Sequence, residues 1–532
     1  MKNLSSDHSI QSHIGKNGKN NVREKSHKVN ERKHARLYHY LALIFLTIFC
    51  YSPILHSGLL WTDYDQVERS PFQLLEKWTE IWTSSENLRE DPITLSTYML
   101  EQAIPLPAPI VHHSINLFLH IVSVILLLKV LDTLNLPAAF CASLVFALHP
   151  ATLQTIFWSG FRTELVGLIL LLTALYIGLT NKGISNYAQL VGVCLIAYWL
   201  HPATLFLPII LGLCIFYQKT TFEIKDYNRL LPLIFFALFA GVLVHNNQAI
   251  KQYDLGEQIN TCAHNLFFYL KQAIVPIKLA LFHPIEESQN LRFGTIINLL
   301  PFLFIAVCYL MVIPNYKKLW ARGLLLGLTS YMLLSMYSLG SFGTFIDGTP
   351  SQVNHTQYIA LPAILTTIVC SLVAIVRKMG ISVSVLWYIG FSIFTIVQFS
   401  YTTLYANSLS NREQMWSDMS TLWPEAWLPK LALLHTIQES EEKNLSTQNR
   451  SINLLEDILQ QQPNLKSERK LLARIYRKAG QNTNALRHYK YILSKEEPDN
   501  TFILEAASFY DQLSLKWEAE KARQRIKSKN NR

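Results

Sequence analysis

Two carboxylates, Asp63 and Asp65, directly follow the first long apolar run of the chain, in the stretch LLWTDYDQVERSP. A carboxylate held where lipid meets water can accept a proton from an acceptor hydroxyl while a lipid-bound reactant stays in the membrane. An ordinary solvated loop would also carry acidic residues here. The residues at the ends of the other apolar runs help to choose between a catalytic carboxylate and an ordinary loop acid.

One such group opens the second apolar run, in HHSINLFLH. His113, Asn116 and His120 are spaced i, i+3 and i+7, so they share one face of a helix. Polar groups on a buried helix face can bond neighbouring helices across a membrane bundle. They can equally line a site, and both interpretations stay open.

A second group lies in LHPATLQTIFWSGFRTELVG, which contains His149, Arg162 and Glu164. Ionisable residues at membrane depth are costly and usually serve a function. A carboxylate beside a cation suits group transfer from a phosphorylated lipid, because the carboxylate takes the acceptor proton while the cation stabilises the departing phosphate. We therefore predict that Asp63, Asp65 and Glu164 are catalytic. The residues predicted to bind the donor phosphate are Arg162, His113, His149, Asn116, His120 and Lys271.

The elements that must position these residues are membrane helices. The chain has 532 residues, of which 50% are hydrophobic and only 16% are charged, and its apolar residues cluster in runs long enough to cross a bilayer. We predict an all-α, polytopic bundle of about eleven spans. The predicted spans are 38–58, 112–133, 136–156, 162–181, 184–200, 201–218, 229–246, 295–314, 322–340, 356–376 and 381–404.

Charge predicts the orientation. Much of the net charge of +10 lies in the polar tail, residues 1–37, which favours a disordered cytoplasmic tail rather than a nucleic-acid partner. The first outer loop, 59–111, is predicted to contain a short amphipathic helix in PFQLLEKWTEIW. Residues 265–282 cannot be a full span without inverting every later loop, so an interfacial or re-entrant segment is expected, with Lys271 and Lys278 at its edges.

The composition becomes polar and helical after residue 405. Ala473, Tyr476 and Ala485 recur in the same order as Ala507, Tyr510 and Ala519. All three offsets are equal and match the tetratricopeptide period of about 34 residues. We predict a connecting segment at 405–430 and a tetratricopeptide-like domain at 431–532, on the same outer side as the first loop.

Several motifs, in order, resemble the tetratricopeptide-bearing, O-mannosyltransferase-like membrane glycosyltransferases of the GT-C superfamily. WTDYDQVERSP is similar to the family's W-D-D-x-x-x-V-x-x-N-P, HHSINLFLH to H-x-x-N-L-L-L-H, and ALHPATLQTIFWSGFRTELV to A-L-H-P-V-x-T-E-x-V-A-W-I-S-G-R-K-D-L-L. QYIALP resembles R-Y-x-Y-L-P. The resemblance covers roughly residues 40–525.

The resemblance implies a glycosyltransferase that uses a polyprenyl-phosphate sugar and a protein or glycan acceptor. Asp63 matches the family's second Asp and Arg162 its Arg, while Glu164 stands where the family has Asp. The chain departs from the family at Thr62 in place of the first Asp, at Gln357 in place of Arg, and at HP (201–202) and EDP (90–92) in place of Lys-Glu and Tyr-Arg-Pro. The resemblance adds His355 to the residues predicted to bind the donor phosphate, because it could replace the family's Arg at Gln357.

Two other functions stay open. One is an O-antigen-ligase-like or polymerase-like transferase, although such proteins carry their working Arg and His in a large late outer loop and the loop before residue 356 has no Arg. The other is an inactive, membrane-anchored repeat scaffold. No cofactor is predicted, a divalent metal stays undecided, and a bacterial inner membrane with the repeats in the periplasm is the favoured location.

Overall fold

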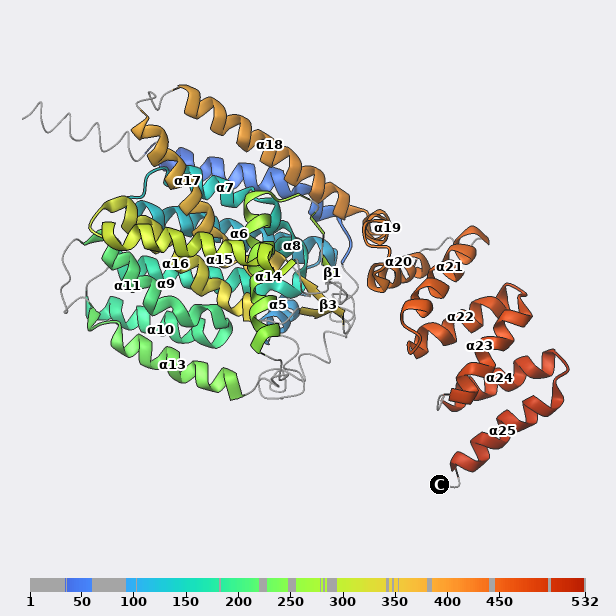
Figure 1. The fold of residues 1–532 in the computed structure, drawn as a ribbon. Coiled ribbons are helices and arrows are strands. Elements are labelled where there is room, and N and C mark those ends of the chain that lie inside the picture. The colour runs from blue at the N-terminus through green and yellow to red at the C-terminus, as the bar shows by residue number, and fades with distance from the viewer. Residues whose placement is uncertain are drawn as a thin grey trace, which may run out of the picture. The chain divides into compact units, whose positions relative to one another are not determined.

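The computed structural model describes residues 34, 36–59, 92–180, 183–219, 227–246, 255–284, 294–340, 344–379, 385–439, 445–495 and 499–530, with a few interruptions of one or two residues. Asp63, Asp65, the amphipathic helix expected in PFQLLEKWTEIW, and Lys278 lie outside these residues. The described part is almost wholly helical (Figure 1). It forms two compact units, whose main boundary lies between Ser410 and Asn411.

Five helices of the first unit are long and apolar enough to cross a membrane. They are Arg36–His56, α6 (Ala108–Thr133), α9 (Arg162–Thr180), Leu319–Met336 within α16 (Leu319–Gly340), and α17 (Leu361–Lys378). A sixth span forms if α7 (Ala139–Ala147) and the segment Pro150–Phe157, which meet at a bend of 50°, count as one. The described residues are thus compatible with a membrane protein.

Helices also occupy the other predicted spans, but these are shorter or less apolar. They are α10 (Ile184–Leu200), η4 (Pro202–Phe206) with α11 (Leu207–Gln218), α13 (Leu231–Asn246), α15 (Gly294–Val312) and α18 (Val385–Ser410). The count of eleven spans therefore remains a prediction. A further helix, α14 (Leu255–Ile274), covers the first ten residues of 265–282 and ends before Pro276. It is not among the helices apolar enough to cross a membrane, and the expected non-spanning character of 265–282 stays a prediction.

Helices distant in sequence pack closely in this unit. The first helix lies beside α18, where Thr403 donates a hydrogen bond to the carbonyl of Cys50 at 3.3 Å and Phe49 stacks on Phe399 (Figure 1). In the crossing of α16 with α17, a Cβ added to Gly327 would lie 1.8 Å from Oγ1 of Thr367. Small residues permit such close crossings between apolar helices.

Three short strands are also described, namely β1 (His283–Pro284), β2 (Thr344–Ile346) and β3 (Thr349–Gln352), in the order β1-β3-β2. Strands β1 and β3 are antiparallel, and His283 pairs with Gln352.

The second unit is a series of helices in which consecutive members contact one another, with α23 and α24 joined by the stacking of Tyr489 on Phe502. They are α19 (Arg412–Leu422), α20 (Trp427–Glu439), α21 (Leu445–Gln461), α22 (Lys466–Lys478), α23 (Asn482–Lys495), α24 (Asn500–Gln512) and α25 (Lys516–Asn530). The predicted connecting segment 405–430 is therefore mostly helical, and the unit begins at Asn411 rather than at 431. Helix α19 begins here because the side chain of Asn411 caps it by accepting from the N–H of Gln414 at 3.1 Å.

The backbone of this unit repeats with the period expected from the sequence. Helix α24 begins one such period after α22, and α25 begins one period after α23. The turn between the members of each pair contains one residue with positive φ, Gly480 at +72° and Ser514 at +60°, and these two residues are separated by the same period. The buried Tyr476 and Tyr510 accept equivalent backbone bonds from Gln481 and Leu515. The two turns thus have the same construction.

Candidate functional site

Arg162 is the centre of a buried polar cluster at the beginning of α9. Its side chain is fully buried, and its Nε donates to Oδ1 of Asn116 on α6 at 2.8 Å. Asn116 in turn donates from Nδ2 to the carbonyl of Ile156 at 3.2 Å. The structure therefore joins two of the residues that the sequence marks as candidates for donor binding.

The guanidinium of Arg162 also has a carboxylate partner that the sequence reasoning missed. Both its terminal nitrogens donate to Glu101, at the end of α5 (Pro92–Glu101), and one donates to Thr97. Nδ1 of His112 contacts Oε2 of the same carboxylate. Arg162 is thus neutralised within the protein, and a phosphate could bind it only by sharing or displacing Glu101.

Glu164 has a different partner. Its Oε2 lies 3.2 Å from Nε2 of His201, and both side chains are buried. Nδ1 of His201 accepts the backbone N–H of Ala203, so Nε2 is the ring nitrogen that carries a proton. Oε2 of Glu164 has no hydrogen-bond partner among the described residues, so the two side chains are in close contact without an aligned hydrogen bond. Gly167 permits this approach, because a Cβ there would lie 3.0 Å from the Cβ of His201.

His201 belongs to a turn that occurs twice. The hexapeptide LHPATL is found at 148–153 and again at 200–205. In both copies the histidine Nδ1 accepts the alanine N–H at 3.2 Å, and the threonine hydroxyl donates to the histidine carbonyl at 2.7 Å. The copies differ at Nε2, because His149 donates to the carbonyl of Ala273 at 3.2 Å whereas His201 faces a carboxylate. Both ring nitrogens of His149 are therefore used by the backbone, which leaves none for a phosphate in this structure.

The two histidines on the α6 face are also buried. His113 lies 3.3 Å from the hydroxyl of Ser57 and stacks on Phe157. His120 lies 2.8 Å from the hydroxyl of Tyr358 and 3.1 Å from the carbonyl of Ala147. The shared face predicted from spacing is thus a buried polar face, with His120 joined to other helices and Asn116 to Arg162.

The last two predicted donor contacts differ in exposure. His355, in η6 (Asn354–Gln357), is buried against Phe161, with ring centroids 3.3 Å apart, and its N–H donates to Gln154. Burial, together with the nearby His201, lowers the pKa of His355 to about 3, so it is neutral at pH 7. Its Nδ1 has no hydrogen-bond partner among the described residues. Lys271 is exposed in the last turn of α14.

No group of three or more His, Cys, Asp or Glu side chains that could hold a metal ion occurs in the described part of the chain. No protein-family model matches this chain, and no curated protein matches it significantly.

Proposed function

We propose that this chain is an integral membrane glycosyltransferase of the GT-C type, which moves a sugar from a polyprenyl-phosphate donor to a protein or glycan acceptor on the non-cytoplasmic side. The observation that carries the proposal is the buried carboxylate of Glu164, which lies 3.2 Å from His201 and two residues along the chain from the buried Arg162. Structural ion pairs also occur in membrane bundles, but two adjacent pairs at the start of one helix favour a site.

In this proposal Glu164 is the described carboxylate best placed to take the proton of the acceptor hydroxyl, and Asp63 is the candidate from the first outer loop. His201 would orient the Glu164 carboxylate. Nδ1 of His201 accepts the N–H of Ala203, so the ring proton of His201 is on Nε2, the nitrogen nearer Glu164. Arg162 supplies positive charge for the departing phosphate. Arg162 would become available to the phosphate if the Glu101 carboxylate turned toward His112, which already contacts that carboxylate. Arg162 would keep its hydrogen bond to Asn116.

The second unit fits a tetratricopeptide-like array in the same proposal. Its repeat period, paired helices and left-handed turn residues are those of such repeats, which bind peptides or proteins along a stacked surface. A protein acceptor would be recruited by this unit. The host membrane would be a bacterial inner membrane, with the repeats in the periplasm.

The alternative is a membrane-anchored repeat scaffold without chemistry. The full engagement of Arg162 by Glu101, Thr97 and Asn116 is the observation that favours it. A transfer assay separates the two, using membranes that contain the full chain and a supplied polyprenyl-phosphate sugar. Glu164→Gln and Asp63→Asn are compared with the parent at matched protein levels. Activity in the parent that falls about 100-fold in either variant supports the enzyme. Absence of transfer by the parent with any supplied donor supports the scaffold.

A further inference from the structure

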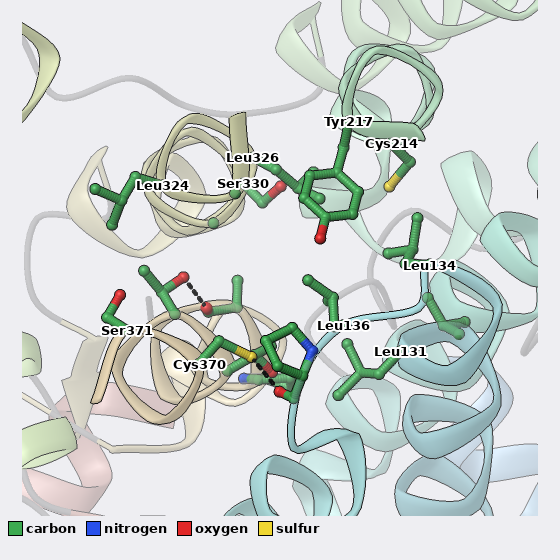
Figure 2. Close-up of a pocket in the computed structure, with 18 of the residues that line it drawn as sticks. Leu131, Leu134, Leu136, Cys214, Tyr217, Leu324, Leu326, Ser330, Cys370 and Ser371 are labelled. Atoms are coloured by element: carbon green, nitrogen blue, oxygen red, sulfur yellow. Dashed lines mark hydrogen bonds between the residues drawn. The ribbon is translucent and has the colours of Figure 1, made fainter. Parts of the chain in front are cut away.

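The helices of the first unit enclose an apolar cavity that the proposed chemistry does not use. Its volume is about 540 Å³, within the roughly 300–1,000 Å³ of small-molecule sites. It lies among α6, α9, α11, α16 and α17. In Figure 2, Tyr217, Leu136 and Cys370 approach the space from three different segments.

The cavity is an unfilled slot rather than a tightly packed core. Leucine is the commonest residue of its walls, and the hydroxyls of Ser330 and Thr366, which are 5% and 9% exposed as residues, have no hydrogen-bond partner among the described residues. Along α17 it extends from Pro362 to Lys378, a rise of about 24 Å. That length accommodates an extended hydrocarbon chain, which spans about half of a 30 Å core.

One end of the slot is cationic. Arg377 and Lys378, both exposed in the last turn of α17, belong to its lining, and no acidic side chain is among the described residues that line it. Cations at a helix C-terminus also stabilise that helix, so charge alone would not require a ligand. Here the two cations adjoin an open apolar slot, which is the arrangement that binds an anionic lipid head group above its hydrocarbon chain.

We propose that this slot binds one anionic phospholipid of the surrounding membrane, with an acyl chain among the leucines and the phosphate against Arg377 and Lys378. The position of the cationic end argues against a polyprenyl-phosphate donor as the occupant of this slot. Arg162 and Glu164 begin α9 and His355 precedes α17, whereas Arg377 and Lys378 end α17. A donor with its phosphate at Arg377 would therefore have its sugar at the wrong end of these helices for the candidate site.

The test uses the fluorescence of Trp320, which lines the slot and is 40% exposed. The full chain is reconstituted into phosphatidylcholine vesicles that contain a minor fraction of a lipid brominated along its acyl chain. This brominated lipid is either phosphatidylglycerol or phosphatidylcholine. The signal of Trp320 is the difference between the parent and Trp320→Phe. We expect brominated phosphatidylglycerol to quench Trp320 at a lower mole fraction than brominated phosphatidylcholine, with saturation.

Three variants test whether the cations and the apolar slot bind the lipid. Arg377→Gln/Lys378→Gln should raise the mole fraction of phosphatidylglycerol needed for half quenching roughly 30-fold, from about 1 kcal/mol for each lost charge. Lys317→Gln/Lys318→Gln removes two exposed charges just before α16 that do not line the slot, and it should leave this value unchanged. Ala374→Phe fills the slot and should abolish saturation in chain that still elutes as a single species from detergent.

Three outcomes would overturn the proposal. Equal quenching by the two brominated lipids would show ordinary lipid contact, and equal weakening by the two double variants would show general surface attraction. Unlabelled polyprenyl phosphate that relieves the quenching at a much lower mole fraction than phosphatidylglycerol would identify a prenyl lipid as the occupant instead.

Discussion

Arg162 and Glu101 form an ion pair in which the two residues are 0% and 4% exposed. Removing one member of a buried pair leaves an uncompensated charge, which typically costs about 3–5 kcal/mol. We expect Arg162→Met and Glu101→Gln each to lower thermal stability in detergent by this order, and the double change Arg162→Met/Glu101→Met to recover much of the loss. The exposed pair Arg450–Glu413 is the control, since Arg450→Gln should cost less than about 1 kcal/mol. Single variants as stable as the control would show that Arg162 and Glu101 are not paired in the membrane.

The duplicated LHPATL turn provides a matched test of His201. Asparagine is a good capping residue, so His201→Asn and His149→Asn both retain an acceptor for the alanine N–H. Only His201→Asn removes a contact with a carboxylate. If Glu164 is the general base, His201→Asn should lower sugar transfer roughly tenfold, as loss of an orienting partner does, and His149→Asn should lower it less. Equal losses in both variants would assign His201 a purely structural role.

The left-handed turn residues predict opposite effects of two substitutions. Gly480 has φ +72°, so Gly480→Ala should lower the free energy of unfolding by about 1 kcal/mol. Ser514 has φ +60°, so Ser514→Gly should raise the free energy of unfolding by about 1 kcal/mol at most. Hydrogen exchange of peptides from 466–478 and 500–512 in the full-length protein measures both. Destabilisation by Ser514→Gly would contradict the equivalence of the two turns.

His488 predicts a pH dependence of the second unit. Burial, with smaller contributions from Arg487 and Arg469, lowers its pKa from 6.5 to about 4. Between these values the unfolded chain binds more protons than the folded chain, so stability is complete above pH 6.5 and falls as the pH drops toward 4. Protection from hydrogen exchange in α22 and α23 should follow this course, and His488→Gln should make it flatter. An unchanged slope in the variant would assign the pH dependence to other groups.

The proposed topology places the repeats outside the cytoplasm. Ser508 is exposed on α24 and Ser185 is exposed on the expected cytoplasmic side, at the start of α10. A membrane-impermeant maleimide added to intact cells should label Ser508→Cys and not Ser185→Cys, after subtraction of the labelling of the parent chain, which has seven cysteines. Labelling of Ser508→Cys only after the inner membrane is permeabilised would invert the proposed orientation.

Local patterns in the sequence were enough to place helices in the predicted spans, but they did not predict α5, which carries Glu101. Apolar runs depend only on neighbouring residues, and helices occupy all eleven predicted segments, although only five are long and apolar enough to be assigned as spans on their own. The spacing of Tyr476 and Tyr510 predicted the period that the backbone of α22–α25 follows. The division between Ser410 and Asn411 was not predicted, because it depends on which helices contact one another.

The partners of the buried charges were decided only by tertiary structure. The spacing of His113, Asn116 and His120 predicts a common helix face, but it does not indicate that Arg162 would meet Glu101 or that Glu164 would meet His201. A buried charge must be neutralised by whichever group the packing of other helices brings within a few ångströms, and Glu101 and Arg162 are 61 residues apart. Sequence spacing therefore determines which residues share a helix face, while the crossing of helices determines which opposite charge that face meets.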